Sequence, residues 1–294
     1  MVTPEVSLVM AAWQPRPDWL REAVASALAE DGCELELIVV DDGSTPPVSE
    51  LLADVDDDRL RVIAVEHGGA ARARNAGNRA ARGRFVRYLD ADDVLERGST
   101  QRLLELSREG SIVYGATLVC DEALRPVARY DCDLEGDLTI PCLLGKFDVR
   151  LSWLFPRNVL EEAGDWDPDF RVCEDWDLVL RALECAPARS DPEIGLHYRR
   201  HSASQTRTAG VADAEVAARR VVRRYFERHP DLRGSRLERR AEAAVDIDKA
   251  LGYADAHDTR ASLRRISRAA RRDPLAVLRS APRLVAAVAR RGRR

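Results

Sequence analysis

Apolar runs alternate with helical patterns through the first ninety residues of the chain. Four apolar runs are expected to be strands, and they lie at 6–10, 35–40, 60–65 and 85–89. The run at 35–40 is apolar nearly throughout, as expected of a strand buried on both faces of a sheet. Between the first two runs, apolar residues from Leu20 to Leu28 recur at helical spacing, and an Ala-rich helical segment at 70–81 precedes the fourth run. Strands and helices in this order predict an α/β fold with a mostly parallel sheet.

The second half of the chain has a mixed pattern. Strands are expected at 111–119 and 152–155, and a helix is expected at 174–184. A polar segment at 202–210 is predicted to be flexible. We therefore divide the chain into an α/β domain at 1–210 and an Arg-rich helical C-terminal region at 211–294.

Helix breaks are expected in the C-terminal region at three residues that disfavour a continuous helix, Pro230, Gly252 and Pro274. Its helices resemble one another in their arginine content, but they show no fixed period, so we do not predict a repeat array.

Several classes of protein are disfavoured by composition. The longest apolar runs fall far short of the roughly 20 residues that cross a bilayer, and the first residues lack the basic start of a signal peptide. We therefore expect a cytoplasmic protein. The six cysteines show no CxxC spacing, which argues against a zinc site or a redox pair and favours buried thiols.

Charge divides the chain unevenly. The net charge is −4, yet residues 215–294 hold 22 basic and 10 acidic residues, which leaves 24 basic and 40 acidic residues in the remainder. The two regions therefore carry net charges of +12 and −16, and we expect them to have different partners. We expect no nucleic-acid partner.

Candidate chemistry gathers where the predicted strands end. Trp13 follows the first strand, Asp42 follows the second, and the cluster Asp90, Asp92 and Asp93 follows the fourth. Because ligands of such sheets bind beyond the carboxyl ends of the strands, these side chains are expected to meet at one edge.

Each acidic motif has two interpretations by itself. Asp42-Gly43-Ser44 can accept hydrogen bonds from a nucleotide, or it can form an ordinary turn. The cluster at 90–93 suits a hard divalent cation, or it can be an acidic loop before a helix that begins near Ser99.

Four stretches taken together are more specific. VSLVMAAWQPRPDWLREAVASALAEDGCELELIVVDDGST, HGGAARARNAG, GRFVRYLDADD and GDWDPDFRVCEDWDLVLRA follow one another in this order. The first 200 residues or so thus resemble family 2 glycosyltransferases of the GT-A fold. The resemblance implies transfer of a sugar from a nucleoside diphosphate donor, with UDP favoured, to an acceptor hydroxyl with inversion at the anomeric carbon.

The resemblance also implies roles for individual residues. Donor binding would involve the first-loop residues Ala11 and Trp13, together with Asp42, Arg74, Asn75 and Asp90. Trp13 would stack on the base, and Asp42 would contact it. Arg74 and Asn75 could equally belong to a solvated helix face, and Trp13 could be an ordinary half-buried aromatic residue.

A divalent cation, Mn²⁺ or Mg²⁺, would be bound by Asp92, with Asp93 and His201 as further candidates. Asp175 matches the catalytic base, although it could also cap the helix it begins, and His201 could be purely structural. The loop AAWQ and His67 depart from the usual pattern, which leaves the preferred donor base open.

Two other functions are weighed against this one. A sugar-nucleotide pyrophosphorylase needs a Gly-rich loop after the first strand, whereas AAWQPRP contains no glycine. A non-catalytic nucleotide-binding protein would not need both the cluster at 90–93 and Asp175.

The end of the chain has an amphipathic pattern. Leu275, Leu278, Val285 and Val288 fall near one helical face, and Arg279, Arg283, Arg290 and Arg291 fall toward another. This pattern suits either packing of the apolar face on the acidic domain or peripheral contact with the inner face of a membrane. The acceptor is expected to be a glycan, a lipid-linked group or another hydroxyl compound.

Overall fold

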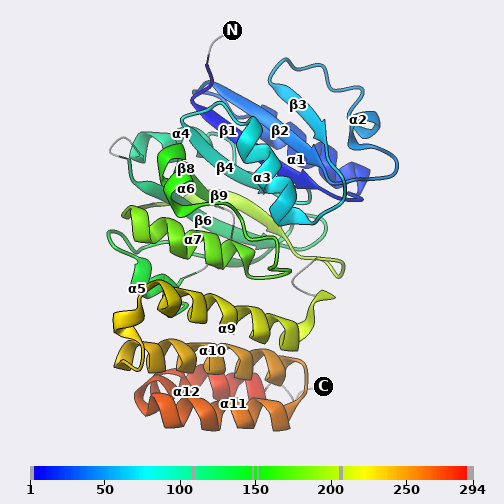
Figure 1. Ribbon diagram of the computed structural model, residues 1–294. Helices are drawn as coiled ribbons and strands as arrows, with labels where there is room; N and C mark the ends of the chain where they lie inside the picture. The colour runs from blue at the N-terminus through cyan, green and yellow to red at the C-terminus, as the bar shows by residue number, and fades with distance from the viewer. Residues whose placement is uncertain (1–2, 108–109, 148, 151, 205–207, 290–294) are drawn as a thin grey trace. The chain divides into compact units, whose positions relative to one another are not determined.

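The computed structural model describes residues 3–107, 110–147, 149–150, 152–204 and 208–289 (Figure 1). The chain forms two compact units, of which the first comprises Met1–Thr139, Phe147–Phe170 and Glu174–Ser204. The second comprises Ile140–Lys146, Arg171–Cys173 and Gln205–Arg294. The sequence-based division at 210 stays a prediction, and part of the segment expected to be flexible, 205–207, lies outside the described residues.

Among the described residues, nine strands of the first unit form one sheet in the order β3-β2-β1-β4-β8-β6-β9-β5, with β7 paired to β6. The strands are β1 (Val6–Ala12), β2 (Leu35–Asp41), β3 (Leu60–Ala64), β4 (Phe85–Asp90), β5 (Val94–Leu95), β6 (Ile112–Cys120), β7 (Pro126–Tyr130), β8 (Trp153–Pro156) and β9 (Ala188–Arg199). The four strands from β3 to β4 are parallel, whereas β8 runs antiparallel to both β4 and β6. This mostly parallel half confirms the α/β fold class expected from the sequence.

The helices of this unit include long amphipathic segments and single turns. They are α1 (Pro17–Leu28), α2 (Val48–Leu51), α3 (Ala70–Ala80), α4 (Ser99–Leu106), α6 (Arg157–Ala163) and α7 (Glu174–Cys185), and α5 (Thr139–Leu143) begins at the unit boundary. The apolar side of α1 packs with β1 and β2 in one core that contains Leu8, Leu20 and Leu37, each fully buried. Burial of such side chains stabilises the fold by about 1.5–3 kcal/mol each.

The α3 helix lies close to β1 and β2, and one glycine allows this approach. A Cβ atom on Gly77 would lie 2.3 Å from Val9 Cγ1 and 3.3 Å from Val40 Cγ2, so a larger residue would push the helix away. Arg74 and Asn75 lie three and two residues before Gly77 on the same helix and are buried. Close packing at Gly77 therefore fixes the position of α3, from which Arg74 reaches Asp90 at the end of β4 and Asn75 reaches the backbone of Trp166.

The second unit is helical beyond residue 208. Its helices are α9 (Gly210–Arg228), the short 3-10 helix η1 (Pro230–Leu232), α10 (Arg236–Asp255), α11 (Thr259–Arg272) and α12 (Pro274–Ala289). Helix breaks occur near Pro230 and Pro274 as expected, but the break expected at Gly252 is wrong because α10 continues to Asp255. A Cβ atom on Gly252 would lie 3.1 Å from Val211 Cγ1, so this glycine serves close packing between α9 and α10.

Buried ion pairs hold the helices of this unit together. Arg219 on α9 binds Glu215 on its own helix and both Glu242 and Asp246 on α10. Arg265 on α11 binds Glu215 at 2.8 Å. Some arginines of the basic region are therefore structural, because they neutralise the almost fully buried carboxylates of Glu215 and Asp246.

Candidate active site

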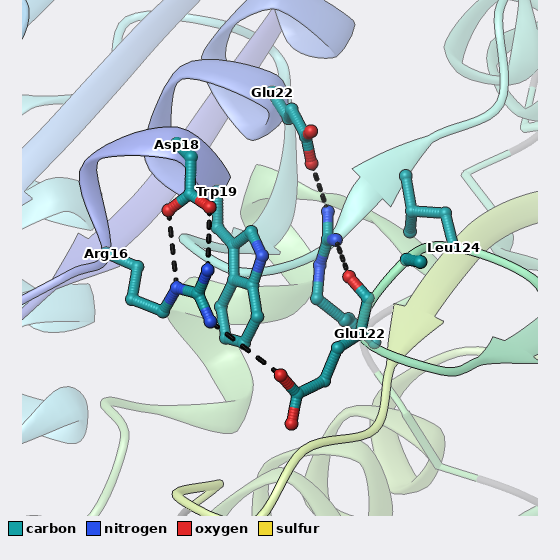
Figure 2. Close-up of a pocket in the computed structure, with 8 residues that line it drawn as sticks. Arg16, Asp18, Trp19, Glu22, Glu122 and Leu124 are labelled. Atoms are coloured by element: carbon teal, nitrogen blue, oxygen red, sulfur yellow. Dashed lines mark hydrogen bonds and ion pairs between the residues drawn. The ribbon is translucent and has the colours of Figure 1, made fainter.

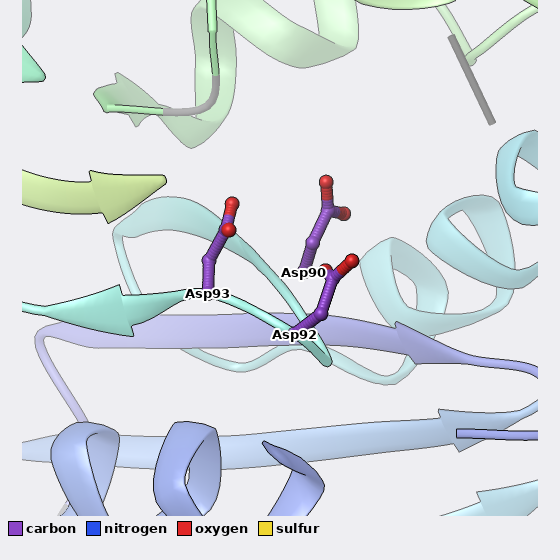
Figure 3. A group of neighbouring side chains, drawn as sticks. All are labelled: Asp90, Asp92 and Asp93. Atoms are coloured by element: carbon purple, nitrogen blue, oxygen red, sulfur yellow. The ribbon is translucent and has the colours of Figure 1, made fainter. Parts of the chain in front are cut away.

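Three acidic side chains converge beyond the carboxyl end of β4. Asp90, Asp92 and Asp93 each offer a carboxylate oxygen, and these oxygens lie within 4.8 Å of one another (Figure 3). Asp90 is the last residue of β4, and Asp92 and Asp93 occupy the tight turn that follows it. The acidic cluster predicted from the sequence therefore exists at one edge of the sheet, and it offers oxygen atoms of the kind that hard cations prefer.

Each acid of the cluster has a partner from a distant part of the chain. Arg74 donates a hydrogen bond of 2.7 Å from Nη2 to Asp90 Oδ1, and His201 Nε2 lies 2.7 Å from Asp92 Oδ2. The backbone N–H of Arg199 donates to Asp93 Oδ1 at 2.7 Å. These contacts fix the direction of all three carboxylates before any ligand binds.

The surroundings of Asp92 and Asp93 make ionisation of these two carboxyl groups unfavourable. Burial raises the pKa of Asp92, and the charge of Asp90 adds to the rise, although His201 opposes it. Burial and the charges of Asp92 and Asp90 raise the pKa of Asp93 well above its ordinary value. Like charges at this spacing are relieved either by a proton or by a cation, so the donor set suits a divalent ion.

Arg74 links this cluster to the start of α7. Its guanidinium contacts Asp90 at 2.7 Å and Glu174 Oε1 at 3.2 Å, and it lies over the Trp166 ring at 4.6 Å from the centroid. Burial lowers the pKa of Arg74, but Asp90 and Glu174 outweigh this effect, so its pKa is raised and its charge is secure. This one buried cation thus joins Asp90 to Glu174, a residue 100 positions after Arg74 in the sequence.

Asp175 follows Glu174 and is the second residue of α7. It is half-buried, and its Oδ1 accepts a hydrogen bond of 2.7 Å from the backbone N–H of Trp176. Burial, followed by the charge of Glu174, raises the pKa of Asp175 to about 7, against the opposing charges of Arg74 and Arg150. A carboxylate with this pKa is suited to proton exchange near neutral pH.

The expected base-binding residues lie at the ends of β1 and β2. Ala11 pairs in register with both Val40 of β2 and Asp90 of β4, so it is the backbone neighbour of the acidic cluster. Trp13 is 58% exposed and stacks on His67, with ring centroids 4.7 Å apart and an interplanar angle of 23°. An exposed, pre-oriented indole of this kind can bind a planar ring.

Asp42 is engaged within the protein. Its two carboxylate oxygens accept hydrogen bonds of 2.8 Å from the backbone N–H groups of Gly68 and Gly69, and Oδ2 also lies 2.9 Å from His67 Nδ1. In this structure Asp42 therefore fixes the loop that carries His67. A direct contact between Asp42 and a base stays a prediction.

Asn75 holds a neighbouring loop rather than pointing at the acidic cluster. Its amide nitrogen donates to Trp166 O at 2.8 Å, and its amide oxygen accepts from the Trp166 N–H at 2.9 Å. This double contact keeps the Trp166 ring beneath Arg74. Contact between Asn75 and a nucleotide also stays a prediction.

Sequence reasoning missed Arg199, which is 2% exposed and supports the cluster from behind. Arg199 Nε donates to Asp92 O at 2.8 Å, Nη1 donates to Glu122 O at 2.6 Å, and Nη2 pairs with Glu22. The sequence offered a signal, because Arg199 is only two residues before the candidate ligand His201.

A pocket of about 280 Å³ lies beside Arg199 and is lined by Arg16, Asp18, Trp19, Glu22, Glu122, Ala123, Leu124 and Arg199 (Figure 2). Arg16 covers one side of the Trp19 ring at 3.9 Å from its centroid, and the guanidinium of Arg199 is 4.9 Å from that centroid. Trp19 also contacts His201 edge-on. Both arginines are paired with acids, so the geometry favours a rigid support for the turn at 92–93.

Comparison with known proteins decides the family. The family model for glycosyl transferase family 2 matches residues 7–161, which include the acidic cluster and Arg74. The chain belongs to glycosyltransferase family 2. This confirms the family that the sequence motifs resembled.

Curated relatives within the family are moderately similar. The succinoglycan biosynthesis protein ExoO of Rhizobium meliloti (strain 1021) is 31% identical over 245 residues, which cover 76% of this chain and 69% of that protein. The uncharacterized glycosyltransferase EpsJ of Bacillus subtilis (strain 168) is 32% identical over 218 residues, which cover 69% of this chain and 63% of EpsJ.

Solved structures show the same fold at lower identity. Residues 1–349 of S. aureus TarS, crystallised in complex with UDP-GlcNAc, match with a TM-score of 0.64 and 16% identity over 92% of each chain. This likeness supports assignment of the fold as GT-A with C-terminal helices.

Proposed function

We propose that this family 2 glycosyltransferase transfers a sugar from a nucleoside diphosphate sugar to an acceptor hydroxyl with inversion at the anomeric carbon. The observation that carries the proposal is the link through Arg74, which contacts the acidic cluster at Asp90 and the start of α7 at Glu174. Candidate ligands for a diphosphate-bound cation and a candidate base, Asp175, thus flank one guanidinium. UDP is the favoured nucleotide, and the complex of TarS with UDP-GlcNAc supports this choice by analogy.

The residues at 90–93 fit a divalent cation. Asp92 and Asp93 would bind Mn²⁺ or Mg²⁺ through carboxylate oxygens, and His201 would orient Asp92 or add a nitrogen ligand. Such a cation, when bound, offsets the charge that develops on the departing diphosphate. Asp90 would remain with Arg74 and contact the ribose side of the donor.

Asp175 would remove the proton from the acceptor hydroxyl as that oxygen attacks the anomeric carbon. In one displacement, the new bond forms on the face opposite the departing diphosphate, and the hydroxyl proton moves to the Asp175 carboxylate. The pKa of about 7 suits this role because the carboxylate is a much stronger base than an ordinary aspartate. The exposed ring of Trp13 would stack on the donor base.

The acceptor proposal is broader. ExoO is described as a succinoglycan biosynthesis protein, which supports a glycan or lipid-linked acceptor for this chain by similarity alone. A cytoplasmic location stays a prediction. In the part of the chain that the structure describes, every helix is too short or too polar to span a bilayer.

The test combines donor turnover with three matched variants. Release of UDP from a panel of UDP-sugars is measured with Mn²⁺ and with chelator for the wild type, Asp92→Asn, Asp175→Asn and Asp31→Asn. Asp31 is an exposed acid near the opposite end of β2, so its variant controls for loss of a carboxylate. We expect turnover in the wild type and Asp31→Asn alone. Binding of UDP without turnover in any protein would instead support a non-catalytic binder.

A further inference from the structure

The last helix leaves an apolar stripe uncovered. Leu275, Leu278, Pro282 and Val285 follow one another at spacings of three or four residues on α12, so they share a face. Leu275 is 51% exposed, Leu278 is 68% exposed and Val285 is 66% exposed. Packing of this apolar face on the acidic domain, one of the two alternatives that the sequence allowed, stays a prediction, and the side chain of Val288 lies outside the described residues.

The opposite side of α12 already supplies the contacts that hold the helix. Ala276 and Val277 pack against the buried cluster of Ala243, Ile247 and Ala269 from α10 and α11. Leu284, on that same side, is 7% exposed. The helices of this unit therefore pack together without the stripe. An exposed apolar surface of this kind is typical of an interaction site.

Exposed arginines flank the stripe. Arg279 and Arg283 lie on the adjoining face of α12, and the exposed side of α11 carries Arg260, Arg264 and Arg271 beside Leu263, which is 59% exposed. None of these five arginines takes part in the buried ion pairs of Glu215 and Asp246. From 259 to 285 the sequence contains eight arginines and a single acid, Asp273.

We propose that the exposed sides of α11 and α12, defined by Leu263, Leu275, Leu278 and Val285 with their flanking arginines, bind the surface of an anionic lipid bilayer. Leucine and valine side chains would enter the acyl boundary, and the arginines would contact lipid phosphates. This surface is independent of the proposed reaction, but it would bring the enzyme to a lipid-linked acceptor.

Two other occupants fit less well. A second copy of the chain would place one set of arginines against another, which opposes association. A nucleic acid would match the arginines, but it would leave the leucine and valine side chains without an apolar partner. The bilayer surface satisfies both the apolar stripe and the positive charge.

The test measures co-sedimentation of the full chain with vesicles of phosphatidylcholine alone and of phosphatidylcholine mixed with phosphatidylglycerol, at low and high salt. The variant Leu275→Glu/Leu278→Glu removes the apolar stripe, and Val216→Glu is its control because Val216 is 70% exposed on α9. We expect the double variant to bind anionic vesicles at least tenfold more weakly than the control. Arg279→Gln/Arg283→Gln should weaken binding about fivefold per arginine at low salt.

Several results would overturn the proposal. It is wrong if the wild type does not sediment with anionic vesicles at low salt, or if the double variant binds as well as Val216→Glu. It is also wrong if the wild type is a dimer by light scattering and Leu275→Glu/Leu278→Glu is a monomer without vesicle binding in either, since the occupant is then a second copy. Release of UDP in solution should be equal in the wild type and the double variant. A negative result for vesicle binding would therefore leave the proposed sugar-transfer reaction unaffected.

Discussion

Asp175→Asn should make the protein more stable while it abolishes most of its activity. The substitution removes a charge that burial and Glu174 destabilise, and the asparagine oxygen can still accept the Trp176 N–H. A rise in pKa from 3.8 to about 7 is about three units, or about 4 kcal/mol at pH 8. Glu174 and Asp175 interact, so the proton that burial favours is shared between the two carboxyl groups. We therefore expect the substitution to raise the free energy of unfolding by about 2–4 kcal/mol.

The sign of this effect depends on pH. A raised carboxyl pKa means that the folded wild type retains its proton more tightly than the unfolded chain does. The wild type therefore loses stability relative to Asp175→Asn as pH rises from about 4 to about 7, and the difference then becomes constant. Activity should have the opposite trend, because the base acts when ionised, so kcat/KM of the wild type should fall as pH decreases below about 7.

Urea unfolding of both proteins at pH 5 and pH 8 measures the stability difference, and UDP release measures the activity. We expect a larger gain at pH 8 than at pH 5, with a rate reduced by about 10²–10⁴-fold. An Asp175→Asn protein that is less stable than the wild type at pH 8 would show that Asp175 is chiefly a helix cap. Undiminished transfer would refute its role as the base.

Three further substitutions test other parts of the site. Asp92→Asn should abolish Mn²⁺-dependent UDP release, because an amide is a weak ligand for a hard cation, and activity that persists in chelator would contradict this. Trp13→Ala should weaken UDP binding by about 1–3 kcal/mol in calorimetry with little change in melting temperature, whereas an unchanged affinity would place the base elsewhere. Arg199→Lys should lower the free energy of unfolding by about 1–3 kcal/mol, since Asp92 O or Glu122 O loses its buried donor, and an unaltered urea midpoint would show that lysine replaces these contacts.

The parallel half of the fold could be predicted because short, continuous stretches of the sequence indicate each of its strands. Each of β1, β2 and β4 is a short apolar run, and Trp13 after β1 and the acids after β2 and β4 mark where ligands bind in such a sheet. The position of β8 could not be predicted in this way. It enters between β4 and β6 from a segment more than sixty residues after β4, and no local pattern encodes that pairing.

The candidate site shows the same division. The cluster at 90–93 follows from spacing, but the burial of Arg199 depends on Glu22 and Glu122, which arrive from two distant segments. The apolar stripe of α12 was visible as a periodicity. Whether other residues cover Leu275 and Leu278 depends on tertiary packing, and helical periodicity does not predict tertiary packing.

We propose that the chain is a metal-assisted, inverting glycosyltransferase whose base is Asp175. Proton NMR of the wild type with Mn²⁺ and a panel of α-linked nucleoside diphosphate sugars tests it, because the anomeric signal of the newly released or transferred sugar reports its configuration. We predict release of the nucleoside diphosphate together with a β-anomeric product from at least one donor, and no such product from Asp175→Asn. An α-anomeric product, or an equal yield of product from the variant, would contradict the account.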